Sequence, residues 1–312
     1  MYARDVPRLR AHMSTWARDP GRDGAAAWLS TVFAMEDEDG TARTPDEVVR
    51  AGPWLARILA AQFPAAHLFH VAPDMLELAR TAGARLPDYT VHPHDLPAEV
   101  GFMALGAPMH TRCAREESEP VRLLTWGPCE GGTMLTVWVE PPDWLTPEFI
   151  PRPGASPLPR SRQARRVRPR HGLLLSTTIR YLSPRAQALA FDEGSEVQRS
   201  VLAMWLLMGQ TLSVSERQAP DRATRRAVAR EDPALGTDVS YIYLRRRRTV
   251  RDSTDSDAPG RNYRHQWWVQ GHWRNQWYAR RDEHRPIWIS PHLAGPEDAP
   301  LLGTERVNLW RR

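Results

Sequence analysis

The chain has 312 residues, of which 41% are hydrophobic and 25% are charged, and its formal net charge is +5. This length is typical of one or two domains with a buried core, and the composition excludes a disordered chain. The sequence has no run of about 20 apolar residues, which a membrane-spanning helix needs, and its first residues lack the apolar core of a signal peptide. We therefore expect a cytoplasmic protein without a membrane partner.

Residues 1–140 are predicted to form an acidic part in which N-terminal helices pack on an antiparallel sheet. Helices are expected throughout residues 1–85, where Thr44-Pro45-Asp46-Glu47 has the pattern of a helix start and Gly83 that of a helix end. The strands expected after them are 98–107, 121–126 and 133–139, and the turn 129–132 is expected to join the last two as a hairpin.

Residues 141–170 interrupt this pattern. They contain eight Pro, and six Arg fall between Arg160 and Arg170, which predicts a linker or a surface loop. Residues 171–312 are then predicted to be a basic α+β part with a Trp-rich hairpin. The predicted fold class of the whole chain is α+β. The elements expected there are a strand at 173–182, a helix at 193–210, a basic helix or loop at 220–230, an alternating segment at 239–250, and strands at 265–273 and 285–290.

Charge is divided unevenly along the chain, in which every basic residue is Arg. Residues 1–150 contain 13 Arg and 21 Asp or Glu, whereas residues 151–312 contain 29 Arg and 16 Asp or Glu. Such asymmetry indicates either that the C-terminal half contacts a polyanion or that the two halves attract each other. For the polyanion contact, the candidate basic surface comprises Arg165, Arg166, Arg168, Arg245, Arg246, Arg247 and Arg248.

Residues 263–292 hold five of the 13 Trp and four of the 11 His of the chain, interspersed with Arg, Asn and Gln. Indole faces beside guanidinium and imidazole groups are suited to stacking on bases or to gripping a peptide, although a Trp-rich hairpin can also simply fill a core. Gly271 within the first expected strand indicates a bulge or a close backbone approach. The candidate binding residues are Trp268, His272, Trp273, Arg274, Trp277, Arg285 and Trp288.

No established catalytic motif occurs in the chain, and we expect neither a cofactor nor a metal. His92 and His94, which flank Pro93, fit an exposed loop better than a metal site, because no third ligand is in view. If the protein is an enzyme, metal-independent cleavage of RNA by His272 and His284 is the chemistry that these residue types allow, since imidazole transfers protons near neutral pH.

The segment Val269-Gln270-Gly271-His272-Trp273-Arg274-Asn275-Gln276-Trp277, followed by Arg285-Pro286-Ile287-Trp288-Ile289, resembles a known protein family. It is similar to the C-terminal signature of the second class of type V-A anti-CRISPR proteins and their relatives in phages, plasmids and bacterial genomes. The resemblance is clear over about 30 residues. Weaker agreement extends to Ser240–Tyr243 and to residues 71–105.

The resemblance implies an inhibitor of protein production rather than a conventional enzyme. The founding class acts on biogenesis of the type V-A effector nuclease, by recognising its nascent N-terminal peptide and causing loss of its mRNA. For this chain, the expected function is thus that of a regulator carried by a mobile element, with the N-terminal peptide of a target protein and RNA or the ribosome as partners. The alternatives are a ribonuclease and a DNA-binding protein of a phage or plasmid.

Overall fold

The computed structural model describes residues 1–21, 24–34, 45–89, 92–111, 119–130, 132–140, 171–182, 196–245, 264–296 and 299–300. The chain divides into two compact units, residues 1–84 with 88–245 and residues 85–87 with 246–312. In the first unit, the helices are α1 (Val6–Arg18), α2 (Ala25–Ala34), α3 (Pro45–Ala65), α4 (Pro73–Gly83), α6 (Glu196–Met208) and α7 (Arg222–Glu231), with short 3-10 turns at Ala3–Asp5 and Pro93–Asp95. Its strands are β1 (His67–Val71), β2 (Gly101–Thr111), β3 (Glu119–Cys129), β4 (Gly132–Val139), β5 (Leu174–Leu182), β6 (Ser213–Gln218) and β7 (Val239–Leu244).

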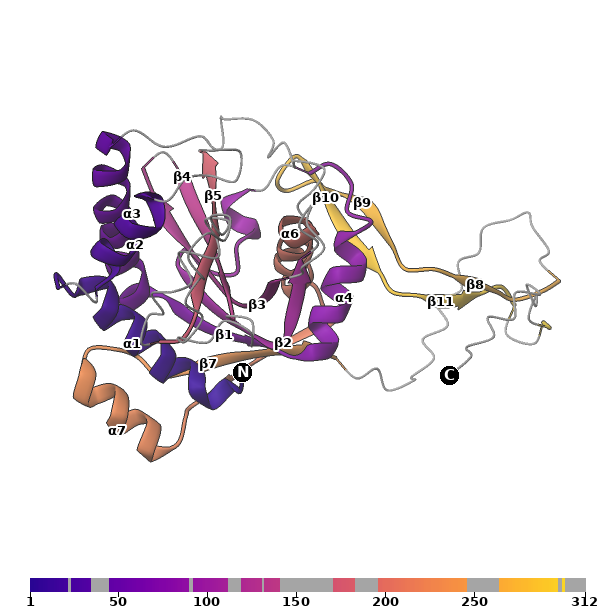
Figure 1. Ribbon diagram of the computed structural model, residues 1–312. Coiled ribbons are helices and arrows are strands. Elements are labelled where there is room, and N and C mark those ends of the chain that lie inside the picture. The colour runs from indigo at the N-terminus through magenta and orange to yellow at the C-terminus, as the bar shows by residue number, and fades with distance from the viewer. Residues whose placement is uncertain are drawn as a thin grey trace, which may run out of the picture. The chain divides into compact units, whose positions relative to one another are not determined.

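These strands form one seven-stranded sheet in the order β5-β4-β3-β2-β1-β7-β6 (Figure 1). Strand β1 is parallel to β2 and to β7, and the other neighbours are antiparallel. Four of the five residues of β1 are buried, as expected of a parallel strand inside a sheet that is covered on both faces. The α+β class is confirmed, but the sheet is mixed rather than antiparallel throughout.

Helices α1, α2 and α3 cover one face of this sheet (Figure 1). Aromatic side chains pack between these helices and the sheet. Along α3, Leu55, Leu59 and Phe63 recur every four residues and are buried. The Trp16 ring of α1 meets the Trp138 ring of β4 edge to face, with 6.2 Å between the ring centroids. Such pairs contribute about 0.5–1.5 kcal/mol beyond their burial, so aromatic contacts fix these helices on the sheet.

Helices α4 and α6 cover the opposite face. The indole of Trp126 in β3 contacts Phe69 of β1 and Trp205 of α6, with ring centroids 5.8 and 5.2 Å apart. A Cβ on Gly101 of β2 would lie 2.0 Å from the Trp126 ring, so this position of the strand accommodates only glycine without rearrangement. Trp126 also donates its indole N–H to the carbonyl of Ala98 at 2.8 Å.

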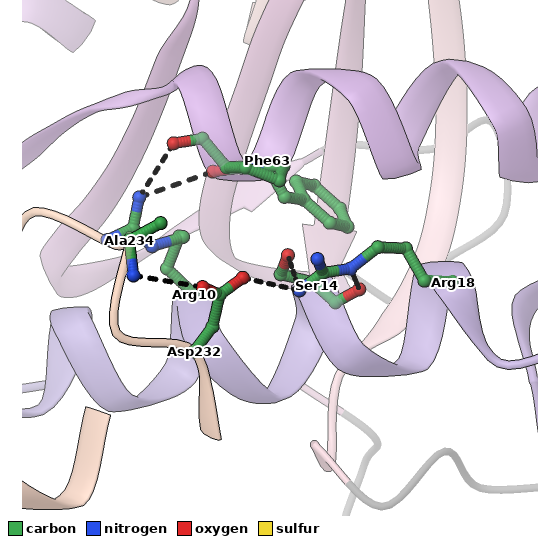
Figure 2. A network of polar contacts seen from close by, with 7 residues as sticks. Arg10, Ser14, Arg18, Phe63, Asp232 and Ala234 are labelled. Carbon is green, nitrogen blue, oxygen red and sulfur yellow. Dashed lines mark hydrogen bonds and ion pairs between the residues drawn. The ribbon is translucent and has the colours of Figure 1, made fainter. Parts of the chain in front are cut away.

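A polar network attaches α1 to its neighbours (Figure 2). The buried guanidinium of Arg10 donates to the Phe63 and Pro64 carbonyls at the end of α3, at 3.4 and 3.2 Å, and to the carbonyl of Gly236. Burial lowers the pKa of Arg10 to about 10, which still leaves it charged at neutral pH. Two turns along α1, Arg18 forms an ion pair with Asp232 at 2.9 Å. Cations of α1 therefore bind both α3 and the segment after α7.

The division into units differs from the expected parts 1–140, 141–170 and 171–312. Strand β5 pairs with β4, and β6 and β7 complete the sheet on the other side of β1. Residues 171–182 and 196–245 thus share a sheet with the first 140 residues, because the strand that follows the Pro-rich segment continues an existing ladder of hydrogen bonds. The compact units part after Arg245.

Candidate binding surface on the Trp-rich ribbon

The described residues of the second unit form four strands, β8 (Trp267–Val269), β9 (His272–Tyr278), β10 (Glu283–Ile289) and β11 (His292–Ala294). Strand β9 pairs with β10 and β8 pairs with β11, both antiparallel, and the register does not shift between the two pairs. We call residues 267–278 and 283–294 the Trp-rich ribbon (Figure 1). At about 3.3 Å per residue, each of these two segments of 12 residues extends for about 40 Å.

A four-residue turn at 279–282 closes the ribbon. Its last residue, Asp282, has a φ of 53°, in the left-handed region that Asp tolerates better than most residues. The backbone N–H of Arg281 donates to the Tyr278 carbonyl at 3.0 Å, and the Arg281 side chain pairs with Glu283 at 3.6 Å. The strands expected at 265–273 and 285–290 are shorter than the paired segments of the ribbon, and the turn between them is shorter than the interval 274–284 that those strands left.

Alternation of side chains along the strands divides the candidate residues between two faces. Residues opposite each other in an antiparallel pair share a face, so the register settles the division. One face, which we call the Trp268 face, carries Trp268, His272, Arg274 and Arg285. The other, which we call the Trp277 face, carries Trp273, Trp277 and Trp288. The seven candidate binding residues therefore do not form a single surface.

The Trp268 face presents an exposed apolar pair at one end and polar groups along its length. Trp268 lies opposite Leu293, and their exposed fractions are 60% and 52%. His272 and Arg274 are also exposed. Nδ1 of His272 hydrogen-bonds the Gln270 carbonyl at 3.0 Å, which directs Nε2 of the ring outward as an acceptor in the neutral form. Leu293 is not among the residues expected from the sequence, because its apolar character becomes informative only when the register places it beside an exposed Trp.

The Trp277 face has a different construction. Trp273 and Trp288 lie opposite each other with ring centroids 5.4 Å apart, and Trp288 is only 5% exposed. A Cβ on Gly271 would lie 2.4 Å from the Trp288 ring, which explains the close approach expected at this glycine. Near the turn, Trp277 is 45% exposed, and its ring lies 4.8 Å from that of His284. Trp288 and Trp273 thus act as the core of the ribbon.

The geometry does not support the ribonuclease alternative. His272 and His284 belong to opposite faces of the ribbon, and His284 pairs with Trp277, five residues from His272 along β9. Five residues of a strand span about 16 Å, which is too far for two groups to act on one phosphodiester. The two histidines are not placed to act as an acid–base pair.

Little of the candidate basic surface falls within the described residues. Arg245 is exposed, and its backbone N–H donates to the Leu212 carbonyl at 2.8 Å. The remaining candidates lie outside the described residues, and they are Arg165, Arg166, Arg168, Arg246, Arg247 and Arg248.

The segment with His92 and His94 is organised by a carboxylate. Asp95 is buried and accepts hydrogen bonds from the Tyr89 hydroxyl at 2.8 Å and from the His92 backbone N–H at 2.9 Å. The two imidazoles stack with ring centroids 5.2 Å apart. Within the described ranges, no group of three or more His, Cys, Asp or Glu is arranged to hold a metal ion.

Two further findings concern membrane-spanning helices and similarity to known proteins. Among the helices in the described part of the chain, none combines the length and apolar character needed to cross a membrane. Comparison with protein-family models and with curated proteins finds no match.

Proposed function

We propose that this chain is a binding protein, an anti-CRISPR-like regulator of a phage or plasmid that holds a target polypeptide and RNA. In this proposal, it acts on the nascent N-terminal peptide of a host defence protein and suppresses production of that protein. The resemblance of residues 269–277 and 285–289 to the type V-A anti-CRISPR signature supports the choice of target class. The ribbon supports binding as the mode of action.

The observation that carries the proposal is the exposed pair Trp268 and Leu293. These two large apolar side chains lie opposite each other and are more than half exposed. Contact of their apolar surface with water is unfavourable, so a partner that covers them gains binding free energy. Trp is among the residues that most often dominate the binding energy of protein interfaces. Along the same face, His272 and Arg274 supply hydrogen-bonding groups that a polypeptide backbone requires. This combination favours a polypeptide on the Trp268 face.

The test is copurification from cells with a tagged full-length chain. We compare the wild type with the double variant Trp268→Ala and Leu293→Ser, and we identify the recovered proteins and RNA by mass spectrometry and sequencing. The matched control is Tyr2→Ala, which removes an aromatic ring that is 69% exposed in the first unit. We expect the double variant to lose a specific protein and its message, while the control retains both.

Circular dichroism of each purified variant verifies that its fold is intact. Both substitutions of the double variant are at exposed positions, so we expect its secondary structure to match that of the wild type. The proposal is wrong if the wild type recovers no specific polypeptide, or if the double variant recovers the same polypeptide in the same amount.

A further inference from the structure

Helix α7 carries a row of arginines on its outer face. Arg222, Arg226 and Arg230 recur every four residues, Arg225 lies beside them, and all four are exposed. Thr224 and Val228 are buried on the opposite side of the helix, at 3% and 1% exposure. Short Ala side chains occupy the remaining positions of the outer face. We call the four arginines the arginine face of α7.

The carboxylates near α7 are engaged elsewhere. Asp221 accepts the Thr224 backbone N–H at 2.7 Å as the N-cap of the helix. Glu231 pairs with His12 of α1 at 2.8 Å, and Asp232 pairs with Arg18 of α1 at 2.9 Å. Within the described part of the chain, no carboxylate forms an ion pair with an arginine of this face. Glu231 and Asp232 thus contact α1, whereas the four arginines of α7 are exposed to solvent.

Like charges four residues apart destabilise a helix by about 0.2–0.5 kcal/mol per pair. The arginine face contains two such pairs, Arg222 with Arg226 and Arg226 with Arg230. Because the described carboxylates do not offset this repulsion, an external anion that bridges the guanidinium groups would relieve it. Repeated cations on one helix face match a ligand that carries repeated negative charges.

Helix α7, which carries the arginine face, packs against α1. Val228 packs with Ala11 of α1 and with Leu235, and all three are buried. The ion pair of Asp232 with Arg18 (Figure 2) attaches the segment after α7 to α1, and the hydrogen bond from Arg10 to the Gly236 carbonyl does the same. A preformed helix loses little conformational entropy when a ligand binds, so its cations act together.

We infer that the arginine face of α7 binds the phosphate backbone of RNA without reading its sequence. Guanidinium groups hold phosphate oxygens through paired hydrogen bonds, and the row from Arg222 to Arg230 covers about 12 Å at 1.5 Å per residue. The face has no Asn or Gln, the side chains that most often recognise adenine, and its alanines allow a backbone to approach closely. The choice of RNA over DNA rests on the proposed function, whereas the inferred contact with phosphate groups rests on the exposed arginines of α7.

The test measures binding of the full-length chain to a fluorescein-labelled single-stranded RNA by anisotropy, over a range of salt concentrations. The variant is Arg225→Gln with Arg226→Gln, and the matched control is Arg50→Gln with Arg57→Gln, two exposed arginines of α3. Each phosphate contact lowers the slope of log K against log salt by about 0.7 for single strands. We therefore expect the α7 variant to reduce the magnitude of the slope by about 1.4 and to weaken binding at 0.1 M salt by roughly 20-fold, whereas the control stays close to the wild type.

A parallel measurement separates this inference from the proposed function. The variant Trp268→Ala with Leu293→Ser keeps α7 intact, so it is expected to bind the RNA with the wild-type slope even if its polypeptide partner is lost. The inference is overturned if the α7 variant keeps the wild-type slope, or if the α3 control lowers the slope equally. Binding that occurs only with duplex DNA or only with anionic lipid vesicles overturns it as well. Gln is a good helix former, so circular dichroism is expected to show an intact α7 in the variant.

Discussion

His171 is a histidine that the fold holds in its neutral form. Its ring lies edge to face against Trp16 and Trp138, with centroids 4.7 and 5.9 Å away, and its Nδ1 accepts the Leu173 backbone N–H at 3.3 Å. Burial lowers the pKa of His171 from an ordinary 6.5 to about 3. The imidazolium would lose its hydration among these rings, so protonation and folding oppose each other.

This opposition predicts how stability depends on pH. Between pH 6.5 and pH 3, the unfolded chain takes up a proton at His171 that the folded chain does not, so the free energy of unfolding decreases as the pH falls. From pH 6.5 to pH 5, the loss from this residue amounts to about 1–2 kcal/mol. We expect His171→Gln to remove that part of the pH dependence, and urea unfolding at pH 7, 6 and 5 measures it.

The matched control for this prediction is His67→Gln, because His67 is exposed. Its pH profile is expected to follow that of the wild type. His70, whose pKa is also lowered by burial, contributes with the same sign, so the variant at His171 retains a residual slope. A variant at His171 with the full wild-type slope would contradict the assignment.

At the scale of elements, the sequence predicts those whose pattern is local. Gly83 ends α4 as expected, the hairpin of β3 and β4 turns at Cys129–Gly132, and the segment expected at 220–230 as a basic helix or loop contains the helix α7. The expectation of helix throughout residues 1–85 is wrong at strand β1, because its five residues are too few to show a period and are buried on both faces. Its identity depends on pairing with β2 and β7, which are distant in sequence.

The candidate site shows the same limit. The Trp-rich segment was found from composition, which is a property of the sequence alone. The division of its residues between the Trp268 face and the Trp277 face follows from the register of the ribbon, which depends on where the 279–282 turn falls. A shift of one residue would have exchanged the faces, so the separation of His272 from His284 was beyond reach of spacing alone.

The position of α1 depends on Arg10, and this gives a prediction at the element scale. Arg10→Met leaves the Phe63, Pro64 and Gly236 carbonyls without their donor, in a region where water does not easily replace it. We expect the free energy of unfolding to fall by about 2–4 kcal/mol, measured by urea denaturation. Arg8→Met, an exposed position on the same helix, is the control and is expected to have little effect. Equal stability of the two variants would show that the carbonyls find other donors.

For the whole molecule, the charge asymmetry of the sequence does not follow the boundary between units. Helix α7 belongs to the basic half of the sequence, yet it lies in the unit that contains the acidic half. The contacts between α1 and the end of α7 pair Arg18 with Asp232 and His12 with Glu231, so the carboxylates come from the basic half of the sequence. Among the residues that the structure describes, attraction between the halves therefore does not neutralise the arginine face of α7, and this supports the contact with an external polyanion that we infer.

Two surfaces with different chemistry predict that the two binding activities can be removed separately. The pair Trp268 and Leu293 belongs to the second unit, and Arg225 and Arg226 belong to the first, so the surfaces share no residue. Substitutions without shared partners have effects on binding free energy that add to within about 0.5 kcal/mol. We expect the ribbon variant to lose its polypeptide with RNA affinity unchanged, and the α7 variant to lose RNA affinity with polypeptide capture unchanged.

The variant that combines all four substitutions tests whether the effects add. In anisotropy measurements, its RNA affinity is expected to equal that of the α7 variant, and in copurification its polypeptide recovery to equal that of the ribbon variant. Loss of aromatic contacts on the ribbon does not change the number of phosphates that the arginines of α7 neutralise. If the ribbon variant alone abolished RNA binding, the ribbon itself would therefore have to contact the RNA, and the two binding activities would not be separate. Additivity thus decides whether polypeptide and RNA are held by separate elements. Only if the two sites are independent is the RNA affinity unchanged by the ribbon substitutions and the polypeptide recovery unchanged by the α7 substitutions.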